Sequence, residues 1–83
     1  MACKIEYKSS VSHDLRQLDK KMANRILSQI NEILSDNSEA GERLHGEFAL
    51  LYKLRLGEYR VIYARTRDGV LILRIRHRSK AYE

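Results

Sequence analysis

Several features that would indicate other kinds of protein are absent from this sequence of 83 residues. A single cysteine, Cys3, can form no internal disulfide, which fits a reducing compartment. No Cys and His spacing resembles a zinc site, so we expect neither a metal nor another cofactor. No run approaches the roughly 18 apolar residues of a membrane span, and the N-terminus alternates charged with apolar residues, unlike a secretory signal. The sequence therefore predicts a cytoplasmic protein without membrane contact.

Most common catalytic motifs are missing as well. There is no glycine-rich phosphate loop, no Ser/His/Asp set and no paired-carboxylate arrangement. What is present, 43% hydrophobic and 33% charged residues without proline, favours a folded helix-and-strand domain. We expect one domain over residues 1–83. A chain this short buries only about 60% of the surface it exposes when unfolded, so a stabilising partner is expected.

The net charge of +5 is concentrated in one half of the chain. Residues 52–82 hold nine Lys and Arg against Glu58 and Asp68, a balance of +7, whereas all other residues together carry −2. A polyanion such as nucleic acid would dock on the basic half. A solvated charged face is the alternative interpretation of charge alone.

The N-terminal half reads as one strand followed by helices. Cys3, Ile5 and Tyr7 alternate with charged residues, as in a strand with one buried face. Apolar residues at three- and four-residue steps then predict helix over 11–35. Ser9 and Ser10 are expected to cap it, and Asp19 to divide it into helices near 11–18 and 20–35, with one continuous helix as the alternative. Residues 36–43 lack periodicity and predict a loop, with a helix cap around Asn37. The apolar stripe consists of Leu15, Leu18, Met22, Ile26, Ile30, Ile33 and Leu34.

Beyond Leu50 the apolar period becomes two, which predicts three strands. The first two run from Leu50 to Leu56 and from Tyr59 to Ala64, and the third covers Val70 to Arg76. Asp68-Gly69 predicts a tight I′ hairpin turn with positive φ before the third strand. The fold class is thus α+β: an N-terminal strand, a two-helix hairpin and a three-stranded antiparallel meander, with the helices on one face of the sheet. The strand tyrosines Tyr7, Tyr52, Tyr59 and Tyr63 are assigned to packing.

Two segments resemble the RelE/ParE toxin superfamily. Residues 52–63 read YKLRLGEYRVIY, similar to the family's Y-x-L-R-x-G-x-Y-R-V-x-Y strand pair. Residues 75–82 read IRHRSKAY, similar to its terminal I-x-H-R-x-x-x-Y segment. The resemblance implies a type II toxin that forms a hetero-oligomer with an acidic antitoxin. RelE-like members cut mRNA in the ribosomal A site, and ParE-like members inhibit DNA gyrase.

The resemblance places the nuclease's basic and tyrosyl positions at named residues. It implies catalytic roles for Lys53, Arg60, Arg76 and Tyr82, and RNA contacts for four further residues. The nuclease pattern often has a lysine two residues before Lys53, where this chain has Leu51, so the general base is left open. The expected RNA-binding residues are Arg55, His77, Arg78 and Lys80.

Metal-free RNA cleavage needs a proton acceptor for the ribose 2′-OH, cations around the phosphorane and a proton donor for the 5′ oxygen. Arg60 and Arg76 suit the phosphorane because guanidinium groups bind phosphate oxygens in forked geometry, although they would also suit an antitoxin's carboxylates. Lys53 and His77 are the alternative bases, but strand alternation would point His77 away from Arg76, so packing is the role favoured for it. Tyr82 could donate the proton, stack on a base or simply cover the core.

Three functions therefore stay open from the sequence. The preferred one is a ribosome-dependent mRNA endonuclease that inhibits translation. The second is a ParE-like gyrase inhibitor, and the third is a basic binding module without activity. In all three, an acidic antitoxin is expected to cover the basic surface.

Overall fold

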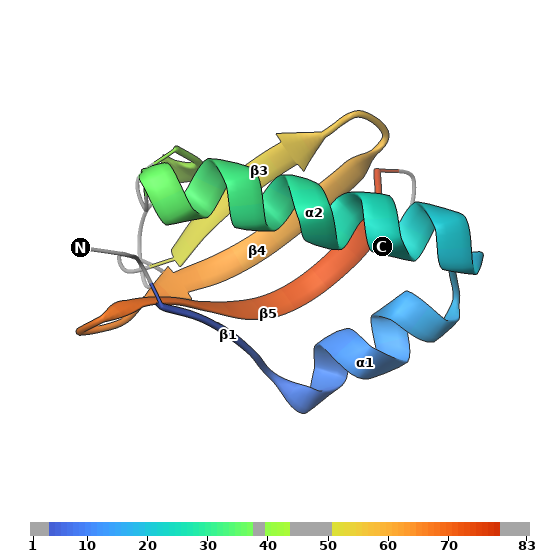
Figure 1. Cartoon of the computed structure of the whole chain (residues 1–83), viewed down its shortest axis with the longest axis horizontal. Coiled ribbons are helices and arrows are strands. Elements are labelled where there is room, and N and C mark those ends of the chain that lie inside the picture. Colours follow the sequence, from blue (N-terminus) through green and yellow to red (C-terminus); the bar gives the residue numbers. More distant parts are fainter. Residues whose placement is uncertain (1–3, 38–39, 44–50, 79–83) are drawn as a thin grey trace.

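A computed structural model describes residues 4–37, 40–43 and 51–78 of the chain (Figure 1). Its elements are β1 (Lys4–Tyr7), α1 (Ser9–Arg16), α2 (Lys20–Asp36), β2 (Glu42–Arg43), β3 (Leu51–Leu56), β4 (Tyr59–Arg65) and β5 (Gly69–His77). Cys3, Lys80 and Tyr82, on which the sequence analysis made predictions, lie outside the described residues. No helix in the described part of the chain has both the length and the apolar character needed to cross a membrane.

The division of the helical region at Asp19 is confirmed. Asp19 is the N-cap of α2, and its carboxylate accepts a 2.7 Å hydrogen bond from the backbone N–H of Met22. The start of α1 differs from the prediction, because Ser9 and Ser10 lie inside the helix and Lys8 is its N-cap, without a side-chain bond. Ser10 is not free to cap the helix because its hydroxyl donates to the β5 carbonyl of Leu73 at 2.6 Å.

The sheet is mixed and has the strand order β1-β5-β4-β3-β2. β1 pairs with β5 in parallel, and the other neighbouring strands are antiparallel, so the predicted meander of β3, β4 and β5 is confirmed. The described residues form five strands where the sequence predicted four, because β2 lies in the segment predicted as a loop. Its two residues, Glu42 and Arg43, are too few to show a period of two.

Positive φ occurs in the β3–β4 turn and not at Asp68-Gly69, where the sequence predicted it. Gly57, between β3 and β4, has a φ of +62° and is the described residue with positive φ. A glycine at the first central position of a two-residue turn is typical of type II′. Gly69 does not have positive φ, so the predicted I′ turn at Asp68-Gly69 is wrong. Gly69 is required for another reason, since a Cβ there would collide with the backbone of Lys4 in β1.

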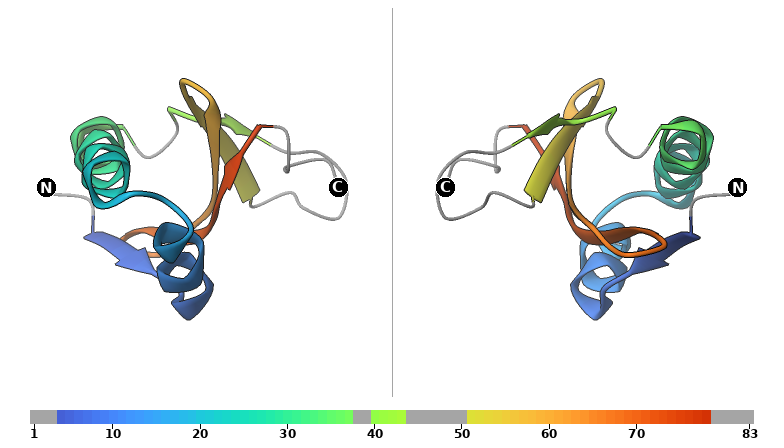
Figure 2. Two further views of the ribbon diagram at one scale, coloured as in Figure 1. Left: turned by 90° about the vertical axis from the view of Figure 1, so that its right-hand side faces the viewer. Right: turned by 90° about the vertical axis from the view of Figure 1, so that its left-hand side faces the viewer.

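Helix α2 covers one face of the sheet and α1 lies along β5 beside the end of β1, with the core between the helices and the sheet (Figure 2). Within the core, Tyr52 and Tyr63 stack with ring centroids 5.3 Å apart. The Tyr63 hydroxyl accepts a 3.0 Å hydrogen bond from the N–H of Gly41, which ties the segment before β2 to the sheet. The predicted packing of Tyr7 is only partial, since 42% of this residue at the sheet's edge is exposed. The buried apolar residues are Val11, Ile26, Ile30, Leu34, Tyr52, Leu54, Leu56, Val61, Tyr63, Val70, Ile72 and Ile75.

Candidate functional site

Three arginines form a row across the sheet face that the helices do not cover. Arg55 of β3 pairs with Arg60 of β4, and Arg60 pairs with Arg76 of β5. Residues that pair directly across neighbouring strands point to the same face, with Cα atoms about 5 Å apart. Their chain neighbours Leu54, Val61 and Ile75 are buried in the core, so the arginines project from the opposite side. We call Arg55, Arg60 and Arg76 the arginine row.

Two further cations lie beside the arginine row. Lys53 is two residues before Arg55 in β3, and Arg74 is two residues before Arg76 in β5, so both belong to the same face. Both pair with Ile62 of β4, which separates them. Like charges opposite one another destabilise a sheet unless an anion compensates them, so this face is suited to bind a polyanion.

Arg60, at the centre of the row, has an unsatisfied donor. Its side chain is half-buried, and its Nε is shielded from solvent without a hydrogen-bond acceptor among the described residues. A buried donor without a partner costs about 1–3 kcal/mol, and more when the group is charged. An anion at this face would supply the missing acceptor once the side chain turns its Nε outward.

The position of Arg76 on this face depends on an irregularity in β5. Tyr63 pairs with Ile72 but Ile62 pairs with Arg74, so Leu73 is an extra residue in β5, a β-bulge. Strict alternation from Val70 and Ile72 would have turned Arg76 into the core. The bulge reverses the alternation, which buries Ile75 and places Arg76 opposite Arg60.

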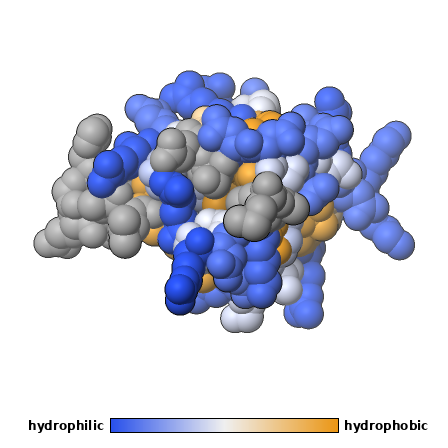
Figure 3. Space-filling model, turned by 60° about the vertical axis from the view of Figure 1, so that its left-hand side comes forward, coloured by the Kyte–Doolittle hydropathy of each residue, from blue (hydrophilic) through white to orange (hydrophobic). Residues whose placement is uncertain are grey.

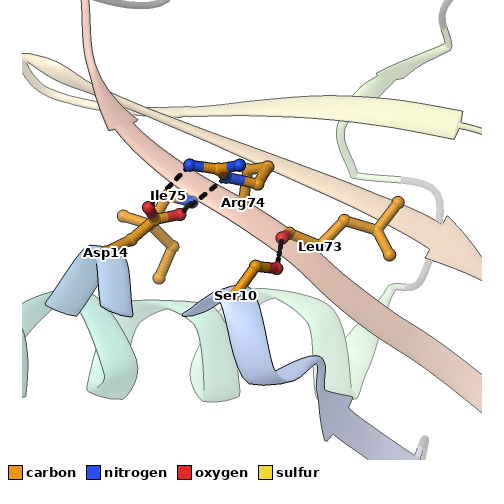
Figure 4. A network of polar contacts seen from close by, with 5 residues as sticks. All are labelled: Ser10, Asp14, Leu73, Arg74 and Ile75. Carbon is orange, nitrogen blue, oxygen red and sulfur yellow. Dashed lines mark hydrogen bonds and ion pairs between the residues drawn. The ribbon is translucent and has the colours of Figure 1, made fainter. Parts of the chain in front are cut away.

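Helix α1 holds this bulge through two side chains (Figure 4). Ser10 donates to the carbonyl of Leu73 at 2.6 Å. Asp14, which is only 7% exposed, accepts from the backbone N–H of Ile75 at 2.9 Å and from Arg74 at 2.9 and 3.0 Å. β1 ends at Tyr7, opposite Ile72. Beyond that point, Ser10 and Asp14 take the place of a neighbouring strand and bond the backbone groups of Leu73 and Ile75. We call Ser10 and Asp14 the α1 clamp.

The remaining predicted site residues lie elsewhere or outside the described part. His77 follows Arg76 on the other face, where its ring meets that of Tyr59 edge-on at 5.3 Å. Arg78 is exposed at the β3–β4 turn: its backbone N–H donates to the carbonyl of Glu58 at 2.7 Å, and the two side chains form a 3.8 Å ion pair. The structure therefore brings Lys53, Arg55, Arg60 and Arg76 together and does not bring His77 or Arg78 to them.

Sequence reasoning gave no individual role to Asp14 or to Arg74. From sequence, an acidic residue in a helix such as Asp14 is expected to face solvent. No neighbouring residue indicates that its partners lie 60 and 61 positions away in β5. In the view of Figure 3, hydrophilic side chains cover most of the surface, and apolar patches between them are small.

The sequence matches the family model described as "ParE toxin of type II toxin-antitoxin system, parDE" over residues 5–82. The chain belongs to this toxin family. It is a toxin of a type II toxin–antitoxin system in the RelE/ParE superfamily, as its two sequence motifs suggested. Among curated proteins, none matches the toxin significantly.

Solved structures share the toxin's fold over nearly its whole length. The archaeal RelE–RelB complex from Pyrococcus horikoshii OT3 matches with 32% identity and a TM-score of 0.69, covering 98% of this toxin and 100% of that chain. The RelBE2 toxin–antitoxin complex from Mycobacterium tuberculosis matches with 24% identity and a TM-score of 0.83, covering 94% and 100%. E. coli RelE, as a mutant in complex with an antitoxin RelBc peptide, matches with 19% identity and a TM-score of 0.73, covering 99% and 92%. The Pyrococcus and Mycobacterium proteins were crystallised with their antitoxins, and E. coli RelE was solved with an antitoxin peptide.

Proposed function

We propose that the toxin is a RelE-type, ribosome-dependent mRNA endonuclease that acts in the cytoplasm. The observation that carries this proposal is the arginine row with the unsatisfied Nε of Arg60 at its centre. A row of guanidinium groups matches the charge and geometry of a phosphodiester, whose oxygens accept forked hydrogen bonds.

Cleavage would proceed by attack of the ribose 2′-OH on the adjacent phosphorus. The 2′-oxygen forms a bond to phosphorus, its proton passes to a base, and the bond from phosphorus to the 5′ oxygen breaks as that oxygen receives a proton. Arg60 and Arg76 would stabilise the pentacoordinate phosphorane between these two steps, because preorganised cations act strongly on developing charge. Arg55 would hold a neighbouring part of the RNA backbone.

The proton transfers are assigned by position. Lys53 lies on the face of the arginine row and is half-buried, whereas His77 lies on the opposite face, so Lys53 is the base that this geometry favours. Tyr82, the proposed proton donor, keeps its role as a prediction from the family resemblance. Leu51 is the first open-face residue of β3, two residues before Lys53, where the nuclease pattern often has a second lysine.

An acidic antitoxin is the proposed partner of the same face. The relatives from Pyrococcus and Mycobacterium were crystallised as toxin–antitoxin complexes, which supports a hetero-oligomer here. Carboxylates would neutralise the arginine row and exclude RNA from it.

A ParE-type gyrase inhibitor is the second candidate, and the name of the matching family favours it. Leu51 in place of a lysine favours it too, because an inhibitor that only binds protein needs no second base. The two candidates differ in what happens to RNA after the toxin is induced.

The test is transcript mapping after brief induction, with Arg60→Ala compared to Arg67→Ala. Arg67 is an exposed cation in the β4–β5 turn, so its removal changes the net charge equally without touching the arginine row. We expect Arg60→Ala to lower mRNA cleavage about 100-fold or more, as when one electrostatic stabiliser is removed, and Arg67→Ala to cleave like the parent.

Two further results bear on the choice of activity. Leu51→Lys should raise cleavage if a second base is what the site lacks. Growth arrest with intact transcripts and a DNA-damage response would reject the nuclease and support gyrase inhibition. A folded Arg60→Ala variant that cleaves like the parent would show that the assigned site is wrong.

A further inference from the structure

A pocket of about 460 Å³ lies between α1 and the end of β5. It occupies the place beside β5 that β1 leaves open, since β1 pairs only as far as Ile72. The α1 clamp closes it on the side toward β1, because Asp14 bridges the helix to Ile75. This volume falls within the range of about 300–1,000 Å³ that is usual for small-molecule sites.

One part of the pocket's lining is apolar and aromatic. Leu18 comes from the segment between the helices, and Ile75 from β5. The rings of Tyr59 and His77 add an aromatic surface, held by their edge-to-face contact at 5.3 Å. A planar base can pack against a surface of this kind.

The other part is lined by hydrogen-bond donors. His13 and Gln17 project from α1, one helical turn apart, and Arg76 comes from β5. None of these three side chains has a hydrogen-bond or ion-pair partner among the residues that the structure describes. Arg74 adds a fourth group, because Asp14 engages its Nε and Nη2 but not its Nη1.

Asp14 also lines the pocket, but its carboxylate does not repel an anion. Both carboxylate oxygens of Asp14 are engaged, one by Arg74 and the other by Arg74 and the backbone of Ile75. Its charge is balanced by the bidentate pair with Arg74. What remains for a ligand is the uncompensated charge of Arg76 and the donors of His13 and Gln17.

Arg76 links the pocket to the arginine row, because it belongs to both. An RNA strand whose scissile phosphate lies on the row could continue past Arg76 into the pocket. The combination of an aromatic wall, a donor-lined wall and room for one small molecule fits a single nucleotide better than a helix of a protein partner.

We propose that the α1–β5 pocket is a second RNA subsite, which binds the nucleotide next to the scissile phosphate. Its base packs on Tyr59 and His77, and its phosphate binds His13, Gln17 and Arg76. This inference rests on the proposed RNA-cleaving function, and it adds α1 to the residues that recognise the substrate.

The test measures the affinity of the full-length toxin for two short RNAs by NMR titration. The probes are di-adenylate and tri-adenylate with 2′-O-methyl riboses, which cannot be cleaved and carry one and two phosphodiesters. The variants are His13→Ala/Gln17→Ala and, as the matched control, Arg16→Ala, an exposed cation of α1 outside the pocket. We expect the double variant to bind tri-adenylate about 10-fold more weakly and di-adenylate unchanged. Arg16→Ala should weaken the binding of di-adenylate and of tri-adenylate slightly and by the same factor.

Several results would overturn the subsite. For the parent toxin, these are equal affinities for the two RNAs or no binding of tri-adenylate at all. For the double variant, they are parental affinity for both RNAs or an equal loss of affinity for both. A double variant that loses antitoxin affinity but keeps its RNA affinity would assign the pocket to the protein partner instead. Pocket-dependent binding of tri-adenylate by a toxin that leaves cellular mRNA intact would show that the pocket binds a nucleotide, but it would reject the nuclease and with it the place of that nucleotide beside a scissile phosphate.

Discussion

Replacement of Asp14 by alanine should strongly destabilise the toxin. The carboxylate accepts three hydrogen bonds, two from Arg74 and one from the backbone N–H of Ile75. Alanine is a good helix former, so α1 itself should tolerate the change. The cost therefore reports on the contact between α1 and β5.

The size of the effect follows from the burial of the partners. The N–H of Ile75 loses its acceptor in a buried position, which costs about 1–3 kcal/mol. The side chain of Arg74 is 39% exposed and regains water, so loss of the ion pair adds at most about 1 kcal/mol. The sum, about 1–4 kcal/mol, is a large share of the roughly 4–12 kcal/mol expected for a domain of this length.

The assay is urea unfolding of the isolated toxin, with the free energy of unfolding taken from a linear extrapolation. The control is Asp14→Asn, which can keep an oxygen in the place of Oδ2, the atom that serves both Ile75 and the Nε of Arg74. The asparagine variant should therefore lose about half as much stability as the alanine variant. In thermal unfolding the alanine variant should melt roughly 5–30 °C lower.

A loss below about 0.5 kcal/mol for Asp14→Ala would refute this reasoning, since that is the usual effect of an exposed surface substitution. Equal losses for the alanine and asparagine variants would show that the charge matters and the backbone contact of Ile75 does not.

Two further predictions concern the other edge contacts. Gly69→Ala should lower the free energy of unfolding by about 1–3 kcal/mol, because the added methyl group would collide with the backbone of Lys4. Gly57→Ala should lower it by only about 1 kcal/mol, because the methyl group has open space there and the cost comes from the positive φ alone. Urea unfolding of both variants measures the two losses, and the reverse order would contradict the close approach of β1 to β5. Burial raises the pKa of Tyr7 above its usual 10.0, so the folded toxin holds this proton more tightly than the unfolded chain. Stability from this group is present below pH 10 and lost above it, and a Tyr7→Phe variant that destabilises as steeply as the parent in alkaline solution would contradict this.

The face of each residue in β3 and β4 could be predicted from the sequence. Tyr52 and Leu54 alternate with Lys53 and Arg55 without interruption, and the two-residue turn at Gly57 sets the register with β4. An uninterrupted period of two assigns every side chain to a face. The pattern is therefore sufficient to predict that Lys53 and Arg55 share a face.

The strand β5 could not be predicted in the same way. Its apolar residues Val70, Ile72 and Ile75 reach one face only because Leu73 forms a bulge. The bulge is held by Ser10 and Asp14, about 60 positions away in sequence, and no local pattern reports a contact over that distance. The unpaired Nε of Arg60 is likewise a property of packing, which composition and spacing do not show.

The parallel pairing of β1 with β5 has a consequence for synthesis of the toxin. Lys4 finds its neighbour, Gly69, only after 65 further residues have been added. Translation proceeds from the N-terminus, so β1 and the α1 clamp wait unpaired until β5 leaves the ribosome. Pairings between such distant segments also form slowly. The row of Arg55, Arg60 and Arg76 is therefore complete only after β5 has been translated and has paired with β4.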